Sequence, residues 1–424
     1  MDEGKLTEFS LKNGLQCVLY DMPGRNSVSI GVWVRMGGRY EPQKYKGIAH
    51  FIEHMLFKGS KKYSCRQIKE ELEGVGASLN GFTSQENTCY LVKISKEHAL
   101  KGLDVLSDMV LNPVLDEAEL EKERMVIMEE IRMYMDLPQH YVVELAEELL
   151  WEGHILGKPL AGTFKTVSNI SRDVMYQFHK KYYRPKNIVV VAAGAIPEGF
   201  KEAVEEAFSD YEPGRRSTFK PFDVKKKSPS MNLFKKKTEQ AHLCMAYQAP
   251  HRTHPMRYPA SVLNVITGGN MSSRLFDEVR EKRGLAYHVS SSYARLSDTG
   301  AFFIKAGTDN LKADKTIALI VKELNSMSNG KITKKEFERA KEFLLGQITL
   351  SLEDSMEVML FLGERKTTNG TIELPDKVRK AIKKVSLESV KKVAMSIFNK
   401  RNMNLALISP LTDGQEKAIR GLGR

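Results

Sequence analysis

The chain has 424 residues and repeats one order of elements after a little over 210 residues, which constrains its fold more than any other feature. Residues 116–119 (Asp-Glu-Ala-Glu) and 333–336 (Thr-Lys-Lys-Glu) each open a long helix with the pattern of a capping box. Along these helices Ile131 falls on Ile348, a shift of 217 residues. We therefore expect two copies of one fold.

The two copies also end alike. Residues 170–173 (Ile-Ser-Arg-Asp) open a helix that leads to a strand near 187–189, and residues 385–388 (Val-Ser-Leu-Glu) open one that leads to 402–404, a shift of 215. Short hairpin signals such as Asn13-Gly14 separate the strands. This order predicts an α+β fold of two homologous repeats, each a mainly antiparallel sheet flanked by helices. We place the N-terminal repeat at 1–211, a basic, proline-containing linker at 212–230 and the C-terminal repeat at 231–424.

The net charge of +12 is concentrated at this linker. Between Glu212 and Lys237, nine Lys or Arg residues face two acids, so this stretch supplies seven of the twelve charges. Interspersed Pro and Gly are typical of a solvated connection. Because no aromatic-basic motif or recognition helix accompanies the charge, we expect no nucleic-acid partner.

The four cysteines show neither a disulfide framework nor the spacing of a thiolate zinc site, which favours a reducing compartment. The first residues lack the apolar region of a signal peptide, and no run of eighteen apolar residues occurs, so we expect no membrane partner. We place the protein in a bacterial cytoplasm. A mature organellar matrix protein whose transit peptide has been removed fits the same observations.

The candidate catalytic motif is His50-Phe51-Ile52-Glu53-His54. On a helix this spacing puts two imidazoles and one carboxylate on one face, while the apolar residues between and around them gather on the other. The segment can therefore pack against a core and still present a metal site. Two imidazoles leave a catalytic zinc one protein ligand short, so a third must come from elsewhere.

Acidic residues on the first long helix are the candidates for that third ligand, and their pattern alone does not choose among Glu121, Glu123, Glu129 and Glu130. Glu123 and Glu130 lie seven residues apart and project almost the same way. Their counterparts in the second copy are Ala340 and Gln347, and the histidines fall near 260–264, where no ligand set exists. Only the first copy can hold a metal by this pattern.

These residues resemble the inverzincin zinc metallopeptidases, the family of pitrilysin, insulin-degrading enzyme and the mitochondrial processing peptidase. The match covers nearly the whole chain, including 47–59, the Glu-Arg-x-Val-Ile-x-Glu-Glu-Ile run at 123–131 and 271–276, and is best with the short two-repeat form of processing-peptidase β subunits and bacterial relatives. The resemblance implies that His50, His54 and Glu130 bind one Zn²⁺ per chain. It also implies that Glu123 holds a ligand histidine in place.

The resemblance implies further residues that meet the substrate. In the second copy, Arg280 and Tyr287 correspond to an Arg and Tyr seven residues apart that contact substrate near the metal. In the first copy, Asn80, Gly81, Phe82 and Thr83 correspond to an edge strand that pairs with peptide backbone. Many family members have Ala where this chain has Gly81.

We therefore expect a zinc endopeptidase that acts on short or unfolded peptides, in which Glu53 is the general base that activates water. The alternative is an inactive or partner-dependent, processing-peptidase-like subunit that presents substrate or serves as a scaffold. Because one chain carries both the zinc motif and the Arg280 and Tyr287 pair, we expect a homodimer, with a heterodimer of related chains as the alternative.

Overall fold

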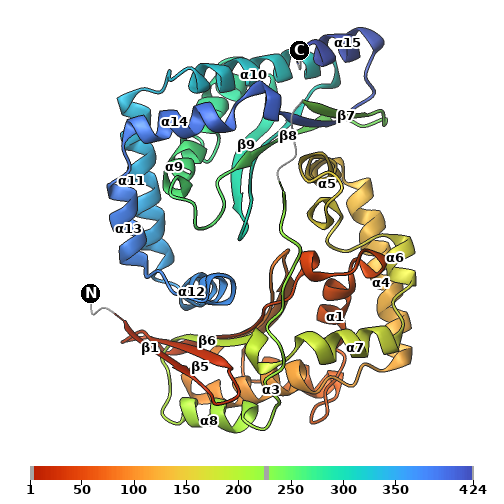
Figure 1. Cartoon of the computed structure of the whole chain (residues 1–424), viewed down its shortest axis with the longest axis vertical. Coiled ribbons are helices and arrows are strands. Elements are labelled where there is room, and N and C mark those ends of the chain that lie inside the picture. The colour runs from red at the N-terminus through yellow and green to blue at the C-terminus, as the bar shows by residue number, and fades with distance from the viewer. Residues whose placement is uncertain (1–3, 224–228, 423–424) are drawn as a thin grey trace. The chain divides into compact units, whose positions relative to one another are not determined.

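The computed structural model describes residues 4–223 and 229–422 (Figure 1). Of these, one compact unit (unit 1) takes the residues up to Ile131, Pro159–Lys220 and Thr349–Leu374. The other (unit 2) takes Arg132–Lys158, the described residues of Pro221–Ile348 and those from Pro375 onward. Within the predicted linker, the described residues 212–223 form neither helix nor strand, and 224–228 lie outside the described residues.

The described part of unit 1 is built on a six-stranded sheet with the order β1-β2-β6-β3-β5-β4. Neighbouring strands are antiparallel except β2 and β6, which are parallel. The predicted hairpin at Asn13-Gly14 joins β1 to β2, with Phe9 opposite Cys17. The strands are β1 (Lys5–Ser10), β2 (Gln16–Asp21), β3 (Ser27–Val34), β4 (Ser78–Thr83), β5 (Thr88–Ser95) and β6 (Ile188–Gly194).

Helices cover both faces of this sheet, as the continuous burial of β3 requires. Val28, Ile30 and Val32 face the main core, whereas Trp33 points to the opposite face, against Met359. The helices of the main core are α1 (Ile48–Leu56), α2 (Cys65–Glu73), α3 (Ala99–Leu111), α4 (Glu117–Asp136), α6 (Phe164–Ser168), α7 (Arg172–Tyr182) and α8 (Phe200–Phe208). The opposite face is covered by α12 (Ser355–Asn369), which lies along β3 and β6 (Figure 1).

Unit 2 follows the same plan. Its described strands form a five-stranded sheet with the order β7-β11-β8-β10-β9, in which only β7 and β11 are parallel. The strands are β7 (Ser230–Phe234), β8 (Ala241–Ala249), β9 (Ala286–Arg295), β10 (Gly300–Thr308) and β11 (Asn404–Ile408). The helices are α5 (Pro138–Leu150), α9 (Arg257–Thr267), α10 (Ala313–Ser328), α11 (Lys334–Ser351), α13 (Pro375–Lys383), α14 (Leu387–Ile397) and α15 (Asp413–Gly421). The predicted α+β class with two repeated, mainly antiparallel sheets is confirmed.

The two packed units differ from the two sequence repeats because one helix of each repeat packs in the other unit. Helix α5 belongs to the first half of the sequence but packs on β8 and β11 in unit 2. Its counterpart α12 belongs to the second half but packs on β3 and β6 in unit 1. None of the described helices combines the length and the apolar run that crossing a membrane takes.

Candidate active site

Helix α1 presents the two histidines and the glutamate of the motif on its accessible face. His50, Glu53 and His54 are partly exposed, whereas the apolar residues of the helix are buried in the main core. The helix begins after Gly47, whose φ of 98° and proximity to the Ala161 carbonyl, 2.4 Å from where a Cβ would be, admit only glycine. The predicted division of the helix into a packed face and an accessible face that carries His50, Glu53 and His54 is therefore what the fold contains.

A buried carboxylate that the sequence did not single out caps this helix. Glu41 Oε1 accepts a hydrogen bond from the Ala49 backbone N–H (2.7 Å), and Oε2 accepts one from Gly47 (3.0 Å). Lys46 Nζ lies 3.0 Å from Glu41 and also donates to the Gly38 carbonyl. The negative charge at the start of α1 is thus both paired and aligned with the helix dipole. This capping group fixes where the motif begins.

We expect Glu41→Ala to lower the free energy of unfolding by about 3–5 kcal/mol, because it leaves the Lys46 ammonium buried without its partner. Chemical unfolding of the chelator-treated chain measures this without a contribution from zinc. The double variant Glu41→Ala/Lys46→Met should recover much of the loss, since no charge is then left buried. The matched control is Glu70→Ala, which breaks an exposed pair with Arg66 and should change stability by less than about 1 kcal/mol. Equal effects of Glu41→Ala and Glu70→Ala would contradict the capping role.

Helix α4 brings the predicted third ligand to the histidines. Leu120, Ile127 and Ile131 bury one side of α4 and so fix its rotation about its axis. Glu130 Oε2 then lies 3.7 Å from Nε2 of His50 and 3.7 Å from Nε2 of His54. One ligand atom from each of the three residues lies within 4.8 Å of the others. The chain thus brings together residues that are 76 positions apart in sequence.

This donor set fits a zinc ion. Zinc binds imidazole nitrogen and carboxylate oxygen at about 2.0–2.2 Å with tetrahedral geometry, which separates two ligand atoms by about 3.4 Å. The observed 3.7 Å is close to this value and too long for a direct hydrogen bond. Three protein donors are also the number that a catalytic zinc site uses. Their assignment as ligands stays a prediction.

Burial sets the protonation of two groups at this site. Burial, together with the neighbouring His54, lowers the pKa of His50 to about 4, which keeps this imidazole in the neutral form that binds metal. Burial raises the pKa of Glu53, and a hydrogen bond from Thr83 offsets part of this rise. A raised pKa makes a carboxylate a better proton acceptor, which suits a group that takes a proton from water.

Glu123 contacts one of the two histidines, and its role in holding that ring in place, which the resemblance implies, stays a prediction. Its Oε2 lies 3.1 Å from Nδ1 of His54, which leaves Nε2 of that ring directed at Glu130. The other oxygen of Glu123 pairs with Lys58. Sequence analysis missed Lys58, although its place four residues after His54 was a usable signal, because it is the spacing of neighbours on a helix. Lys58 supplies a positive charge beside the Glu123 carboxylate.

The predicted substrate strand is β4, the edge strand of the unit 1 sheet, and among the described strands it pairs with β5 alone. Phe82 packs edge-on against Trp33, so its side chain faces away from the main core. Gly81 lies beside Phe57, which a Cβ would meet at 3.0 Å, so an alanine here needs a small shift of that ring. Asn80 Oδ1 accepts from the Gly81 N–H, and Thr83 contacts Glu53. The pairing of this strand with peptide stays a prediction.

Arg280 and Tyr287 lie together in unit 2. Arg280 stands in a π-helical turn, Phe276–Glu281, and its guanidinium lies 5.2 Å from the centre of the Tyr287 ring and 4.8 Å from that of Phe276. Tyr287 is 77% exposed. The structure thus pairs these two side chains, as expected of an Arg and Tyr that act together. Their action on substrate stays a prediction.

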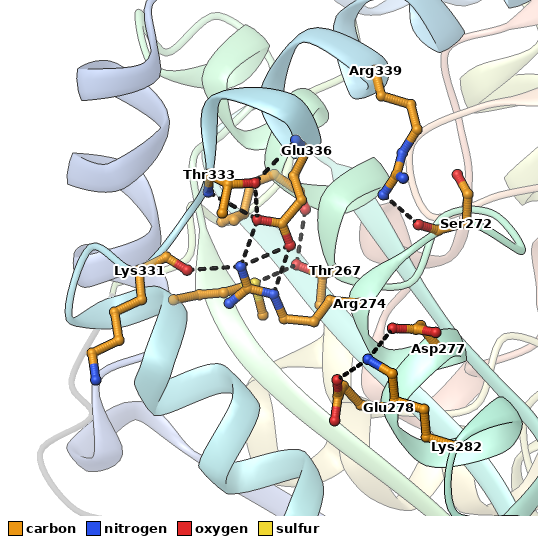
Figure 2. Close-up of polar contacts among 12 residues, drawn as sticks. Thr267, Ser272, Arg274, Asp277, Glu278, Lys282, Lys331, Thr333, Glu336 and Arg339 are labelled. Atoms are coloured by element: carbon orange, nitrogen blue, oxygen red, sulfur yellow. Dashed lines mark hydrogen bonds and ion pairs between the residues drawn. The ribbon is translucent and has the colours of Figure 1, made fainter.

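Polar contacts tie the segment just before this turn, which includes Ser272 and Arg274, to α11 and the residues that precede it (Figure 2). Arg274 donates to both oxygens of Glu336 at 2.7 and 2.8 Å and to the Lys331 carbonyl. Glu336 also completes the predicted capping box with Thr333. Arg339 donates to the Ser272 carbonyl, which anchors the segment before the turn.

The comparisons with known proteins agree with this reading. Residues 17–164 match the model of insulinase (peptidase family M16), and residues 169–344 match that of the peptidase M16 inactive domain. The uncharacterized zinc protease YmxG of Bacillus subtilis is 38% identical over 96% of this chain and 98% of its own length. An uncharacterized zinc protease of Streptomyces coelicolor is 32% identical over 98% and 92%.

Solved structures share the fold. The crystal structure of a protease from Helicobacter pylori matches with a TM-score of 0.91 and 24% identity over 96% of this chain and all of that one. The family model described as the inactive domain covers most of the second copy. In that copy the counterparts of Glu123 and Glu130 are Ala340 and Gln347. The resemblance seen in the sequence is thus confirmed, and the chain belongs to peptidase family M16.

Proposed function

We propose that the chain is a zinc-dependent endopeptidase that cleaves short or unfolded peptides. The observation that carries this proposal is the convergence of His50, His54 and Glu130, with Glu53 on the same face of α1. The names of the relatives, which are uncharacterized zinc proteases, support the metal and the reaction class. A bacterial cytoplasmic location stays a prediction.

The chain's own residues account for most of the chemistry. Zinc held by His50, His54 and Glu130 would acidify water and polarise a peptide carbonyl. Glu53 takes one proton from water while the water oxygen bonds to the carbonyl carbon, and it later gives that proton to the amine nitrogen as the C–N bond breaks. By the family resemblance, Arg280 and Tyr287 stabilise the charge that develops on the carbonyl oxygen. Strand β4 would hold the peptide backbone by strand addition.

We also propose that the active form is a homodimer, since one chain carries both the zinc motif and the Arg280 and Tyr287 pair. The alternatives are a heterodimer with a related chain and a catalytically inactive subunit that presents substrate or serves as a scaffold. These possibilities differ in whether the lone chain cleaves peptides and in the size of the assembly that does so.

One experiment tests these proposals together. The lone chain is separated by size, and each fraction is assayed for zinc per chain and for cleavage of a quenched peptide, with and without chelator. We expect one zinc per chain and cleavage that chelator abolishes and added zinc restores, in a fraction of dimer size. Zinc-loaded chain that cleaves no member of a random peptide library would contradict the endopeptidase and support the inactive or partner-dependent alternative.

A further inference from the structure

The last residue of β4 makes a direct contact with the candidate base. Thr83 Oγ1 donates a hydrogen bond to Glu53 Oε2 at 2.5 Å. Alternation along the strand explains the direction: Phe82 faces Trp33 on the far side of the sheet, so its neighbour Thr83 faces α1. The side chain of Thr83 is therefore committed to Glu53 and not to a peptide that would pair with the strand's outer edge.

The position of Thr83 is fixed from its cross-strand neighbour. Thr83 pairs with Thr88, a fully buried residue whose own hydroxyl donates to the Met36 carbonyl at 2.9 Å. Thr88 Oγ1 also lies 3.5 Å from Thr83 Oγ1. Since a threonine hydroxyl carries one hydrogen, and that of Thr83 goes to Glu53, Thr83 is a donor with one defined acceptor.

The turn after Thr83 is held just as firmly. Ser84 and Asn87 close it with a backbone bond of 2.8 Å, and Ser84 accepts from the Gly38 N–H at 3.0 Å. Within the turn, Glu86 forms a fully buried ion pair with Arg39 at 2.6 Å. A buried ion pair and turn hydrogen bonds of this kind restrict motion. The hydroxyl of Thr83 is thus presented by a rigid hairpin end.

The two carboxylate oxygens of Glu53 differ in their hydrogen bonding. Oε2 accepts from Thr83, whereas Oε1 receives no hydrogen bond from any of the residues that the structure describes. Glu53 is partly exposed, and Oε1 is not among the buried side-chain atoms without a partner, so this oxygen can meet water. A carboxylate held by one oxygen keeps the other in a constant direction, which is the condition for efficient proton transfer.

We propose that Thr83 is a positioning residue, whose hydroxyl holds Glu53 in the orientation that directs Oε1 at the reacting water and so couples the end of β4 to the base. This rests on the proposed function, in which Glu53 takes the proton. It assigns Thr83 an effect on the rate of the chemical step, distinct from the substrate contact that the resemblance implies for the strand.

The test compares Thr83→Val, which keeps the shape and removes the donor, with Thr83→Ser, which keeps the donor. In the zinc-loaded full chain, we expect Thr83→Val to lower kcat roughly 10- to 100-fold, the effect of losing one hydrogen bond to a charged group, with KM changed less than about 2-fold. Thr83→Ser should retain kcat within about 3-fold. Thr83→Ala, expected to behave like Val, guards against a variant that fails to fold, and zinc content is measured for each. Thr7→Val, the same substitution at an exposed position of β1 on the opposite edge of the sheet, is the control that should change neither constant.

A double-mutant cycle separates positioning from a structural role. In the Glu53→Gln background, Thr83→Val should lower the residual rate no further, because its partner can no longer take a proton. A rise in KM at constant kcat, wild-type kinetics for Val and Ala, or an undiminished effect in the Glu53→Gln background would each overturn the proposal. If the wild-type chain itself shows no zinc-dependent cleavage, the proposed function has failed first. An active wild type with a normal Thr83→Val isolates the failure to Thr83.

Discussion

Glu53→Gln is expected to retain zinc and to lose roughly 10²- to 10⁴-fold in kcat, the usual contribution of a general base. Glutamine has the same shape and can still accept the hydrogen bond from Thr83, but it cannot take a proton from water. Zinc should stay bound because Glu53 is not one of the three residues whose ligand atoms converge. Steady-state kinetics and zinc content of the same preparation measure both effects.

The control for this substitution is Glu117→Gln, an exposed carboxylate in the first turn of α4. It removes the same charge from the same unit and should leave kcat, KM and zinc content unchanged. Cleavage at the wild-type rate by Glu53→Gln would show that another group takes the proton. Loss of zinc from Glu53→Gln would instead indicate that this carboxylate contributes to metal binding.

Local patterns predicted the helix that carries the candidate ligands well. The spacing of His50, Glu53 and His54 and the apolar residues between them depend only on helical periodicity, which the sequence contains directly. The cap of that helix depends on Glu41, which precedes it by several residues and belongs to no local capping motif. A contact across a loop of this kind leaves no periodic signal, so it emerges only when the chain is folded.

The choice among the acids of α4 shows the same limit. Periodicity gave four candidates, but the rotation of α4 about its axis decides between them, and that rotation is set by which residues the core takes up. Burial of Leu120, Ile127 and Ile131 directs Glu123 and Glu130 to α1. Glu121, which is exposed, instead pairs with the buried Arg124. Here the family resemblance supplied what the pattern could not.

The exchange of α5 and α12 between the units could not be predicted, because the two helices occupy equivalent places in homologous repeats and their patterns suit either sheet. Side-chain volume distinguishes them in the folded chain. Gly363 of α12 lies against Trp33, where a Cβ would come within 2.1 Å of the ring. A shift of 217 places Ala146 of α5 at the equivalent position, in a cluster with Ala246 and Phe303. Such complementarity is a property of pairs distant in sequence.

The assignment of His50 as a zinc ligand predicts an effect on cleavage as large as that of Glu53→Gln. His50→Ala should abolish stoichiometric zinc binding and, with it, chelator-sensitive cleavage, because it leaves a catalytic site with one imidazole and one carboxylate. The loss of zinc affinity should exceed the roughly 10- to 100-fold that replacing an outer partner of a ligand costs. The fold should survive, since α1 packs through its buried apolar residues and is capped by Glu41, neither of which involves His50. Zinc per chain after dialysis measures the effect, with the unfolding midpoint as a check on folding.

The control, His140→Ala, removes an exposed histidine of α5 and should keep full zinc. Burial keeps His50 neutral, which is the form that binds zinc. Full zinc occupancy in His50→Ala would mean that a different set of donors holds the metal, and it would contradict the assignment of Glu130 as well.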